Sequence, residues 1–143
     1  MMKSTEEYRD SLRSYNPRVF IDGRQIENVA DEPLLQPGIN GIGITYDYAS
    51  KPEFAPLMLA REQETGKMVN RLLHIDRTTD DLLAKLEAIR ILCCEAGCVQ
   101  RYLVHDAFNG LYQATKRCDA EEGTSYFERF RDFMTEVQDK DLS

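Results

Sequence analysis

The sequence of 143 residues has no tryptophan, only two histidines and no long apolar run. No stretch approaches the roughly 18–20 consecutive apolar residues that cross a bilayer. The first segment, Met1 to Arg18, is polar and charged, which excludes a signal peptide there. We therefore expect a cytoplasmic protein with no membrane partner.

Basic residues are also scarce in this chain. Lysine and arginine number 18 against 25 aspartates and glutamates, which gives a net charge of −7. A nucleic-acid-binding protein needs a basic stripe to neutralise phosphates, so we expect no nucleic-acid partner. The 42% apolar and 30% charged residues are typical of a folded chain, and the length is that of one domain covering residues 1–143.

The signature motifs of several common enzyme classes are missing as well. The sequence contains no G-x-G-x-x-G, no P-loop, no G-x-S-x-G and no H-E-x-x-H. Of its four cysteines, Cys93, Cys94 and Cys98 lie within six residues, and there is no C-x-x-C. Such crowding does not suit a disulfide framework, so reduced and buried structural thiols are favoured over a metal site.

The apolar residues that are present predict a mainly α fold with one small β-hairpin near residues 18–27. Helices are expected at about residues 5–15, 39–49, 79–96, 98–117 and 125–137. Asp22-Gly23 between two apolar runs indicates the hairpin turn. Residues 68–75, which include His74, are expected to be irregular or extended. The third helix is expected to bury a stripe, which consists of Leu82, Leu86, Ile89 and Cys93, widened by Leu83 and Leu92.

The second predicted helix is rich in glycine. Gly38, Gly41 and Gly43 each cost about 1 kcal/mol against alanine in a helix interior. They indicate either close packing on a neighbouring element or a weaker, frayed helix.

The most unusual stretch is residues 98–112. At helical spacing, one side carries chemically active groups, which are Cys98, Arg101, Tyr102, His105, Asn109 and Tyr112. The other side carries apolar residues, which are Val99, Leu103, Ala107, Leu111 and Ala114. An ordinary solvated face carries Glu, Lys, Gln and Ser, so this composition points to ligation, titration or hydrogen bonding of a bound molecule.

Two interpretations of this stretch stay open from spacing alone. In the functional one, Arg101 holds an oxygen by charge-assisted hydrogen bonds and His105 acts as a general acid or base. Tyr102 and Tyr112 then donate hydrogen bonds to a substrate, and Cys98 is a metal ligand or reactive thiol. In the structural one, Arg101 pairs with Asp106 or another acid, and His105 is a satisfied interface residue.

The same stretch resembles a known family. Cys98-Val-Gln-Arg101 followed by Asp106-Ala-Phe-Asn109 is similar to the 4-hydroxybutyryl-CoA dehydratase (vinylacetyl-CoA isomerase) branch of the 4-hydroxyphenylacetate 3-hydroxylase family. The likeness covers nearly the whole chain, with further matching segments at residues 6–12, 18–29, 79–82 and 123–126.

The resemblance implies an acyl-CoA-dehydrogenase-like architecture, of which this chain looks like the helical N-terminal domain only. FAD would be bound mostly by a β-rich middle domain and a C-terminal helical bundle. The implied partners are those flavin-binding domains or a separate subunit, together with a phenolic or acyl-CoA substrate. The complete enzyme would be a homo-oligomer, and this domain alone would be inactive.

The resemblance also implies roles for single residues. In the dehydratase branch, two cysteines four residues apart bind a [4Fe–4S] cluster, and these positions hold Cys98 and Tyr102 here. Because tyrosine replaces one thiolate, we expect the cluster to be absent or altered. In the hydroxylase branch, an arginine and a tyrosine contact the phenolic substrate, and these map to Arg101 and His105. Arg101 and His105 are thus the catalytic candidates. The substrate-binding candidates are Arg101, Tyr102, Asn109 and Tyr112, and the metal candidate is Cys98.

Two function hypotheses follow. In the first, the chain is the N-terminal substrate-side domain of a flavin-dependent hydroxylase or dehydratase-like enzyme. It predicts that Cys98, Arg101, Tyr102 and His105 share a face lining a groove, and that apolar surface is exposed where other domains dock. In the second, the chain is a stand-alone helical binding or assembly domain that kept the fold without catalysis.

Overall fold

The computed structural model describes residues 2–98 and 101–142, and within them the chain is mainly helical, as predicted. The longer helices are α1 (Thr5–Tyr15), α2 (Gln36–Ser50), α4 (Thr79–Ala96), α5 (Tyr102–Glu122) and α6 (Tyr126–Asp139). The short elements are β1 (Val19–Ile21), β2 (Arg24–Ile26), η1 (Val29–Asp31), α3 (Ala55–Met58), β3 (Leu59–Arg61), β4 (Met68–Asn70) and η2 (Arg71–Leu73). None of the helices among the described residues is long and apolar enough to cross a membrane.

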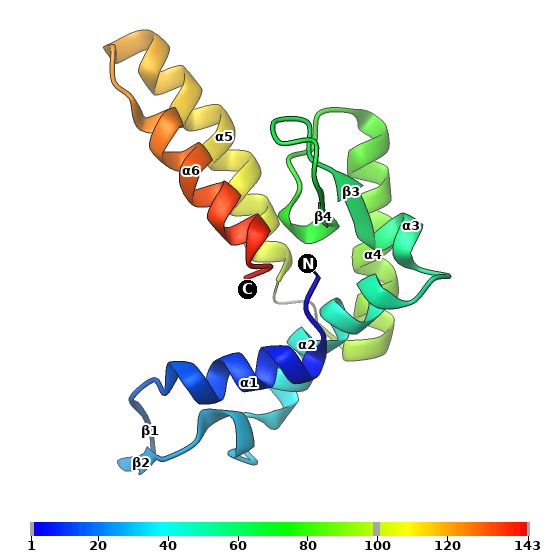
Figure 1. Cartoon of the computed structure of the whole chain (residues 1–143), viewed down its shortest axis with the longest axis vertical. Coiled ribbons are helices and arrows are strands. Elements are labelled where there is room, and N and C mark those ends of the chain that lie inside the picture. The colour runs from blue at the N-terminus through cyan, green and yellow to red at the C-terminus, as the bar shows by residue number, and fades with distance from the viewer. Residues whose placement is uncertain (1, 99–100, 143) are drawn as a thin grey trace.

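The helices form two arms that meet at a central junction (Figure 1). One arm is the pair α5 and α6, which lie side by side, and the other holds α1, α2 and the β1–β2 hairpin. The β3–β4 hairpin lies beside α4, and α3 packs on both α2 and α4. The two ends of the described chain meet at the junction, where the Lys3 amide donates to the Asp141 carboxylate at 3.1 Å.

The helix boundaries follow the capping signals of the sequence. Ser4 and Glu7 form a capping box at the start of α1, and Thr78 and Asp81 form another at the start of α4. Gly97 ends α4 in the left-handed region, where glycine carries no Cβ penalty. These caps confirm the predicted positions of the first and third helices.

The β1–β2 hairpin is confirmed, with Asp22 and Gly23 at φ values of 50° and 77° as its turn requires. A second antiparallel hairpin, β3–β4, was missed by the prediction of a single hairpin. Its strands have three residues each, too few to display an alternating pattern. The Glu62 amide donates to the Lys67 carbonyl at 2.9 Å beyond the strand ends, so the turn that the sequence indicated closes this hairpin.

The buried stripe predicted for α4 is wrong at its N-terminal half. Leu82, Leu83 and Leu86 are exposed, whereas the helix buries Ala88 and Leu92 completely. The latter two face a core shared with α2, α3 and η2. The helix carries leucines on more than one side, so periodicity alone did not identify the side that is buried.

Candidate functional site

The candidate residues gather at the N-terminal half of α5, but Cys98 is not on that helix. The prediction of one helix from Cys98 was wrong, because the described helix begins at Tyr102 after Arg101 as its cap residue. Cys98 is exposed and precedes it, and the predicted apolar residue Val99 lies outside the described residues. Arg101 and Tyr102 are therefore brought to the beginning of α5, with Cys98 on the preceding segment.

The polar side of α5 is its buried side. Arg101, His105 and Tyr112 are 2%, 0% and 4% exposed, whereas Leu103 and Leu111 are 54% and 45% exposed. The active groups therefore face the protein interior, and the apolar residues that the sequence placed on the opposite side face solvent. Leu103 and Leu111 are thus exposed apolar residues on α5, and docking of other domains on them stays a prediction.

The Arg101 guanidinium is enclosed by partners from distant parts of the chain. It pairs with the carboxylate of Asp141, and both side chains are completely buried. It also donates to the Leu142 carbonyl at 3.0 Å and to the Thr45 hydroxyl at 3.4 Å, and it stacks 4.2 Å from the centre of the Tyr46 ring. The counter-ion of Arg101 is thus an acid 40 residues away in sequence.

His105 lies within a small charged group one turn further along α5. Its Nε2 is 3.2 Å from Asp76, whose other carboxylate oxygen lies 3.8 Å from the Lys85 ammonium. The Asp106 carboxylate lies 3.7 Å from Nδ1 of His105. Burial lowers the pKa of His105, Asp76 opposes that effect, and Lys85 reinforces it. The net lowered pKa keeps the imidazole neutral at neutral pH.

Asn109 holds the backbone of the segment that carries Asp76. Its amide nitrogen donates to the carbonyls of His74 and His105 at 3.2 and 2.9 Å, and its amide oxygen accepts from the Asp76 backbone at 2.8 Å. Asn109 therefore joins α5 to the connection between η2 and α4.

Tyr112 completes this side of the helix. Its hydroxyl accepts hydrogen bonds from Arg77 at 2.6 Å and Lys116 at 2.5 Å, and it donates to the Glu64 carboxylate at 3.0 Å. Hydrogen bonds from Arg77 and then Tyr112 lower the pKa of Glu64. The phenol thus joins α5 to the β3–β4 turn.

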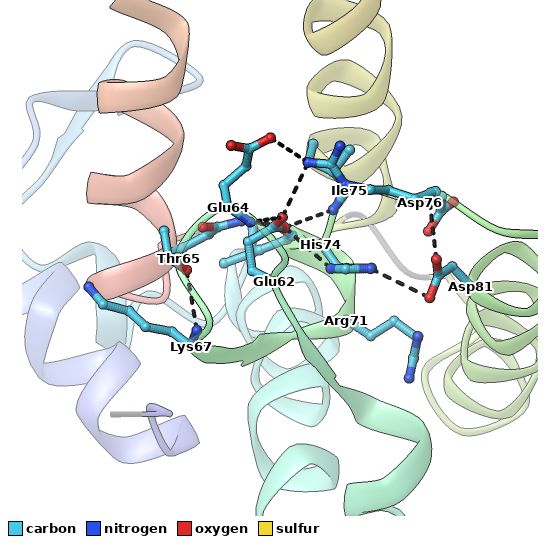
Figure 2. A network of polar contacts seen from close by, with 12 residues as sticks. Glu62, Glu64, Thr65, Lys67, Arg71, His74, Ile75, Asp76 and Asp81 are labelled. Carbon is cyan, nitrogen blue, oxygen red and sulfur yellow. Dashed lines mark hydrogen bonds and ion pairs between the residues drawn. The ribbon is translucent and has the colours of Figure 1, made fainter. Parts of the chain in front are cut away.

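Sequence reasoning missed a second buried network, which Figure 2 shows between the β3–β4 turn and the start of α4. Glu62 is completely buried, and one of its oxygens lies 3.3 Å from Nδ1 of His74. Nε2 of His74 lies 3.6 Å from Asp81, which forms the capping box of α4 with Thr78. The imidazole thus lies between two carboxylates from different elements.

Further donors satisfy the Glu62 carboxylate. The Ile75 amide donates to it at 3.2 Å and the Gln138 side chain at 3.3 Å. Burial raises the pKa of Glu62, but the adjacent His74 imidazole and the hydrogen bond from the Ile75 amide outweigh burial and leave that pKa lowered. In the sequence, Glu62 stands among Arg, Gln and Glu, a pattern typical of a solvated turn, so no local signal marked it.

The residues present do not fit an iron–sulfur cluster. The two positions that the family resemblance assigns to the cluster hold the thiol of Cys98 and the phenol of Tyr102, and a phenol is not a normal ligand of a [4Fe–4S] cluster. Cys93 and Cys118 are half-buried, whereas Cys94 and Cys98 are exposed. The prediction of buried structural thiols was therefore wrong.

Two grooves share Leu142 in their linings, and neither lining includes Cys98, Arg101, Tyr102 or His105, so neither is the groove that these four residues were predicted to line. The larger, about 440 Å³, is called the tyrosine groove and is lined by Lys3, Tyr8, Ser11, Leu12, Tyr15, Tyr46 and Leu142. The smaller, about 230 Å³, is apolar and is lined by Val104, Phe108, Phe133, Val137 and Leu142. Leu142, whose carbonyl binds Arg101, borders both grooves.

Comparison with known proteins identifies the family. The model of the family described as 4-hydroxyphenylacetate 3-hydroxylase N terminal matches residues 4–143. The chain belongs to the 4-hydroxyphenylacetate 3-hydroxylase family. A relative within it, the 4-hydroxybutyryl-CoA dehydratase/vinylacetyl-CoA-Delta-isomerase of Clostridium aminobutyricum, is 37% identical over 143 residues, which are 99% of this chain and 29% of the relative.

Solved structures of the 4-hydroxyphenylacetate 3-hydroxylase family share the fold. The oxygen-tolerant archaeal 4-hydroxybutyryl-CoA dehydratase from N. maritimus matches with a TM-score of 0.93 and 34% identity, over 99% of this chain and 28% of that one. A second match is the oxygenase component (HpaB) of 4-hydroxyphenylacetate 3-monooxygenase, complexed with FAD and 4-hydroxyphenylacetate. Its TM-score is 0.78 and its identity 21%, over 99% of this chain and 29% of that chain. The predicted family and helical N-terminal fold are thus confirmed, and the chain spans less than a third of these relatives.

Proposed function

We propose that this chain is the substrate-side domain of a flavin-dependent aromatic hydroxylase or 4-hydroxybutyryl-CoA dehydratase-like enzyme, and that it is inactive alone. The observation that carries the proposal is the match of 99% of the chain to only 28–29% of relatives whose names state these activities. The flavin-binding parts would come from the other regions that those relatives contain, on the same polypeptide or on a separate subunit. The complete enzyme would be a cytoplasmic homo-oligomer.

The identities favour the acyl-CoA side of the family. The chain is 37% and 34% identical to two dehydratases, against 21% to the oxygenase. An acyl-CoA is therefore the preferred substrate class, and a phenol is the second. Because Tyr102 stands where the dehydratase branch has a cysteine, the proposed chemistry uses no [4Fe–4S] cluster.

In this proposal, the beginning of α5 forms the wall of the substrate site. Arg101 and His105 are the catalytic candidates, one helical turn apart, and the neutral imidazole of His105 suits acceptance of a proton. Tyr102, Asn109 and Tyr112 are the other substrate-side candidates. Their internal hydrogen bonds would position the backbone of α5 against the substrate.

FAD, when bound, would supply the electron-transfer chemistry of the complete enzyme. The tyrosine groove of about 440 Å³ has one cation, Lys3, in its lining, so it offers little to the two phosphates of FAD. The proposal therefore assigns FAD binding mainly to the regions outside this domain.

A domain exchange tests the proposal. The matching segment of the Clostridium aminobutyricum enzyme is replaced by this chain, and FAD content, assembly and binding of 4-hydroxybutyryl-CoA and 4-hydroxyphenylacetate are measured. We expect the chimera to retain FAD and bind one substrate, whereas the isolated chain is colourless and inactive. Arg101→Ala should weaken substrate binding in the chimera, and the exposed Arg117→Ala on the same helix should not.

A second candidate function is a stand-alone helical binding or assembly domain. It is favoured by the internal partners of the candidate residues, since Arg101 already pairs with Asp141 and His105 with Asp76. A chimera that assembles with FAD but binds neither substrate would favour this alternative. A chimera that neither assembles nor retains FAD would refute the substrate-side proposal.

A further inference from the structure

An apolar groove lies between α5 and α6, next to the end of the described chain (Figure 1). We call it the phenylalanine groove. It is lined by Val104 and Phe108 of α5, Phe133 and Val137 of α6, and Leu142. Its volume of about 230 Å³ is below the roughly 300–1,000 Å³ of pockets that hold small-molecule ligands. Its size and chemistry therefore suit bulky apolar side chains from another polypeptide segment.

One ring in this groove is positioned but not covered. The Phe133 ring packs edge-on against the Phe108 ring, with the ring centroids 6.2 Å apart, yet Phe133 is 54% exposed. Phe130, three residues earlier on α6, packs against the same ring and is 7% exposed. Since burial of apolar surface is favourable in proportion to its area, the exposed part of Phe133 is available to stabilise a partner.

The backbone of the chain is fixed at the edge of this groove. Helix α6 ends at Asp139, and Asp141, at a φ of 44°, turns the chain back. The Leu142 amide then donates to the Val137 carbonyl at 3.0 Å, and the Leu142 carbonyl accepts from Arg101 at 3.0 Å. A polypeptide that continues from Leu142 therefore starts beside the groove.

The relatives contain such a continuation. The family model describes an N-terminal part, and this chain covers only 28–29% of the two dehydratases and the oxygenase. In those proteins, more than two thirds of the polypeptide therefore lies outside the matched part. We use the term following segment for about the first twenty residues after the matched part, since an extended residue spans about 3.3–3.6 Å and twenty are enough to turn back and cross the groove.

We propose that the phenylalanine groove is the docking site of the following segment of the complete enzyme, which inserts aliphatic or aromatic side chains beside Phe133. This inference rests on the proposed function, and it names a surface through which this domain joins the flavin-binding regions. The ring of Phe108 and the backbone at Leu142 are already in place, so docking requires no rearrangement of α5 or α6.

Size and charge favour a tethered segment over a separate partner. The groove has five lining residues, whereas each partner in a stable interface contributes about 20–30. A second copy of this chain would also bring a second net charge of −7. A segment joined to Leu142 is present at a high effective concentration and loses little translational freedom on docking, so a small apolar groove is enough to hold it.

A cross-linking experiment identifies the occupant in the chimera described above. The photoreactive residue p-benzoylphenylalanine is placed at position 133 or, as the control, at position 126. Tyr126 is 48% exposed on the same helix but does not line the groove. After irradiation, mass spectrometry maps the products, and a mixture of unlabelled and ¹⁵N-labelled chimera marks cross-links between copies.

We expect position 133 to cross-link within the following segment of the same polypeptide, and position 126 not to reach that segment. Cross-links from position 133 to a different region of the enzyme or to a second copy would overturn the inference. The absence of any cross-link from position 133 would overturn it as well.

Hydrogen exchange of the following segment in the chimera is the second measurement. Phe133→Ser removes the half-exposed ring, so amide exchange in this segment should become at least about tenfold faster, which corresponds to about 1.4 kcal/mol. Phe133→Leu keeps an apolar side chain and should retain most of the protection, and Tyr126→Ser should leave the exchange unchanged. An unchanged rate in Phe133→Ser, or equal increases in the two serine variants, contradicts docking in the groove.

These outcomes are separable from those of the proposed function, because the FAD content of the same chimera is measured independently. A chimera without FAD would count against the proposed function, while the cross-link from position 133 would still show where the following segment lies. A chimera that retains FAD but lacks this cross-link would overturn the docking inference alone.

Discussion

Gly43 of α2 and Thr5 of α1 lie so close that a Cβ atom on Gly43 would be 2.6 Å from Cγ2 of Thr5. The Cβ of Thr5 itself would lie at 3.2 Å, so a rotation of the threonine side chain cannot relieve the contact. Of the two interpretations of the glycine-rich helix, close packing therefore holds at this position. The glycine sets the distance between α1 and α2.

The first prediction concerns this contact. Gly43→Ala should destabilise the chain by about 1–3 kcal/mol, because α1 must move away from α2. Gly38→Ala in the same helix meets no atom within 4 Å and should be neutral or stabilising by up to about 1 kcal/mol. Chemical denaturation of the three proteins measures both changes, and equal effects at the two positions would contradict the packing argument.

The second prediction concerns the buried carboxylate of Glu62. Its lowered pKa means that its contribution to stability is present above the unfolded pKa, about 4.3, and is lost as the pH falls through the folded value. Glu62→Gln should cost about 1–3 kcal/mol at pH 7 and flatten the stability profile below about pH 4.3. Glu128→Gln, which alters an exposed pair with Arg131 on α6, is the control and should keep the wild-type profile.

The third prediction concerns the protonation of His105. Since its folded pKa is lowered, the unfolded chain binds the proton more readily, and stability should decrease as the pH falls below about 6.5. Lys85→Met should raise the pKa of His105, and Asp76→Asn should lower it, because the first removes a repelling cation and the second an attracting anion. The chain has two histidines, so proton NMR titration follows His105 directly, with His74 as internal reference. Shifts of the same sign in both variants would refute this electrostatic account.

The fourth prediction separates core from docking surface. Leu92→Ala, at a position with no exposure, should cost about 2–5 kcal/mol, whereas Leu111→Ala, at 45% exposure, should change stability by less than about 0.5 kcal/mol. Assembly of the chimera should instead depend on the exposed position: Leu111→Ser should weaken the association of this domain with the flavin-binding regions. Unchanged assembly of Leu111→Ser would mean that this side of α5 is not a docking surface.

The parts of the fold that follow from local chemistry were predictable from sequence. Ser4, Thr78 and the pair Asp22-Gly23 fix a helix start or a turn through atoms only a few residues away. The short β3–β4 hairpin was not predictable. Thr65 and Gly66, which has a positive φ, mark a turn, but the strands on either side are too short to show an alternation of apolar and polar residues.

The candidate site was predictable as a set of residues but not in its orientation. The spacing placed Arg101, His105 and Tyr112 on one side of a helix, and the structure keeps them together. Their partners, Asp141 and Glu64, are distant in sequence, and no local pattern links them. The inward side of α5 therefore combines long-range polar contacts with the buried ring of Phe108, and the spacing of residues along the helix does not show the polar contacts.

The contact of Arg101 with Asp141 also bears on the order in which parts of the chain fold. The α5–α6 pair joins neighbouring helices and closes a short loop, so it can form early. Asp141 meets Lys3 across 138 residues and Arg101 across 40, and such closures cost more chain entropy. During synthesis, Arg101 leaves the ribosome well before its counter-ion, so the nascent chain carries an unpaired guanidinium until α6 is complete. We therefore expect the junction of the two arms to form after the α5–α6 pair.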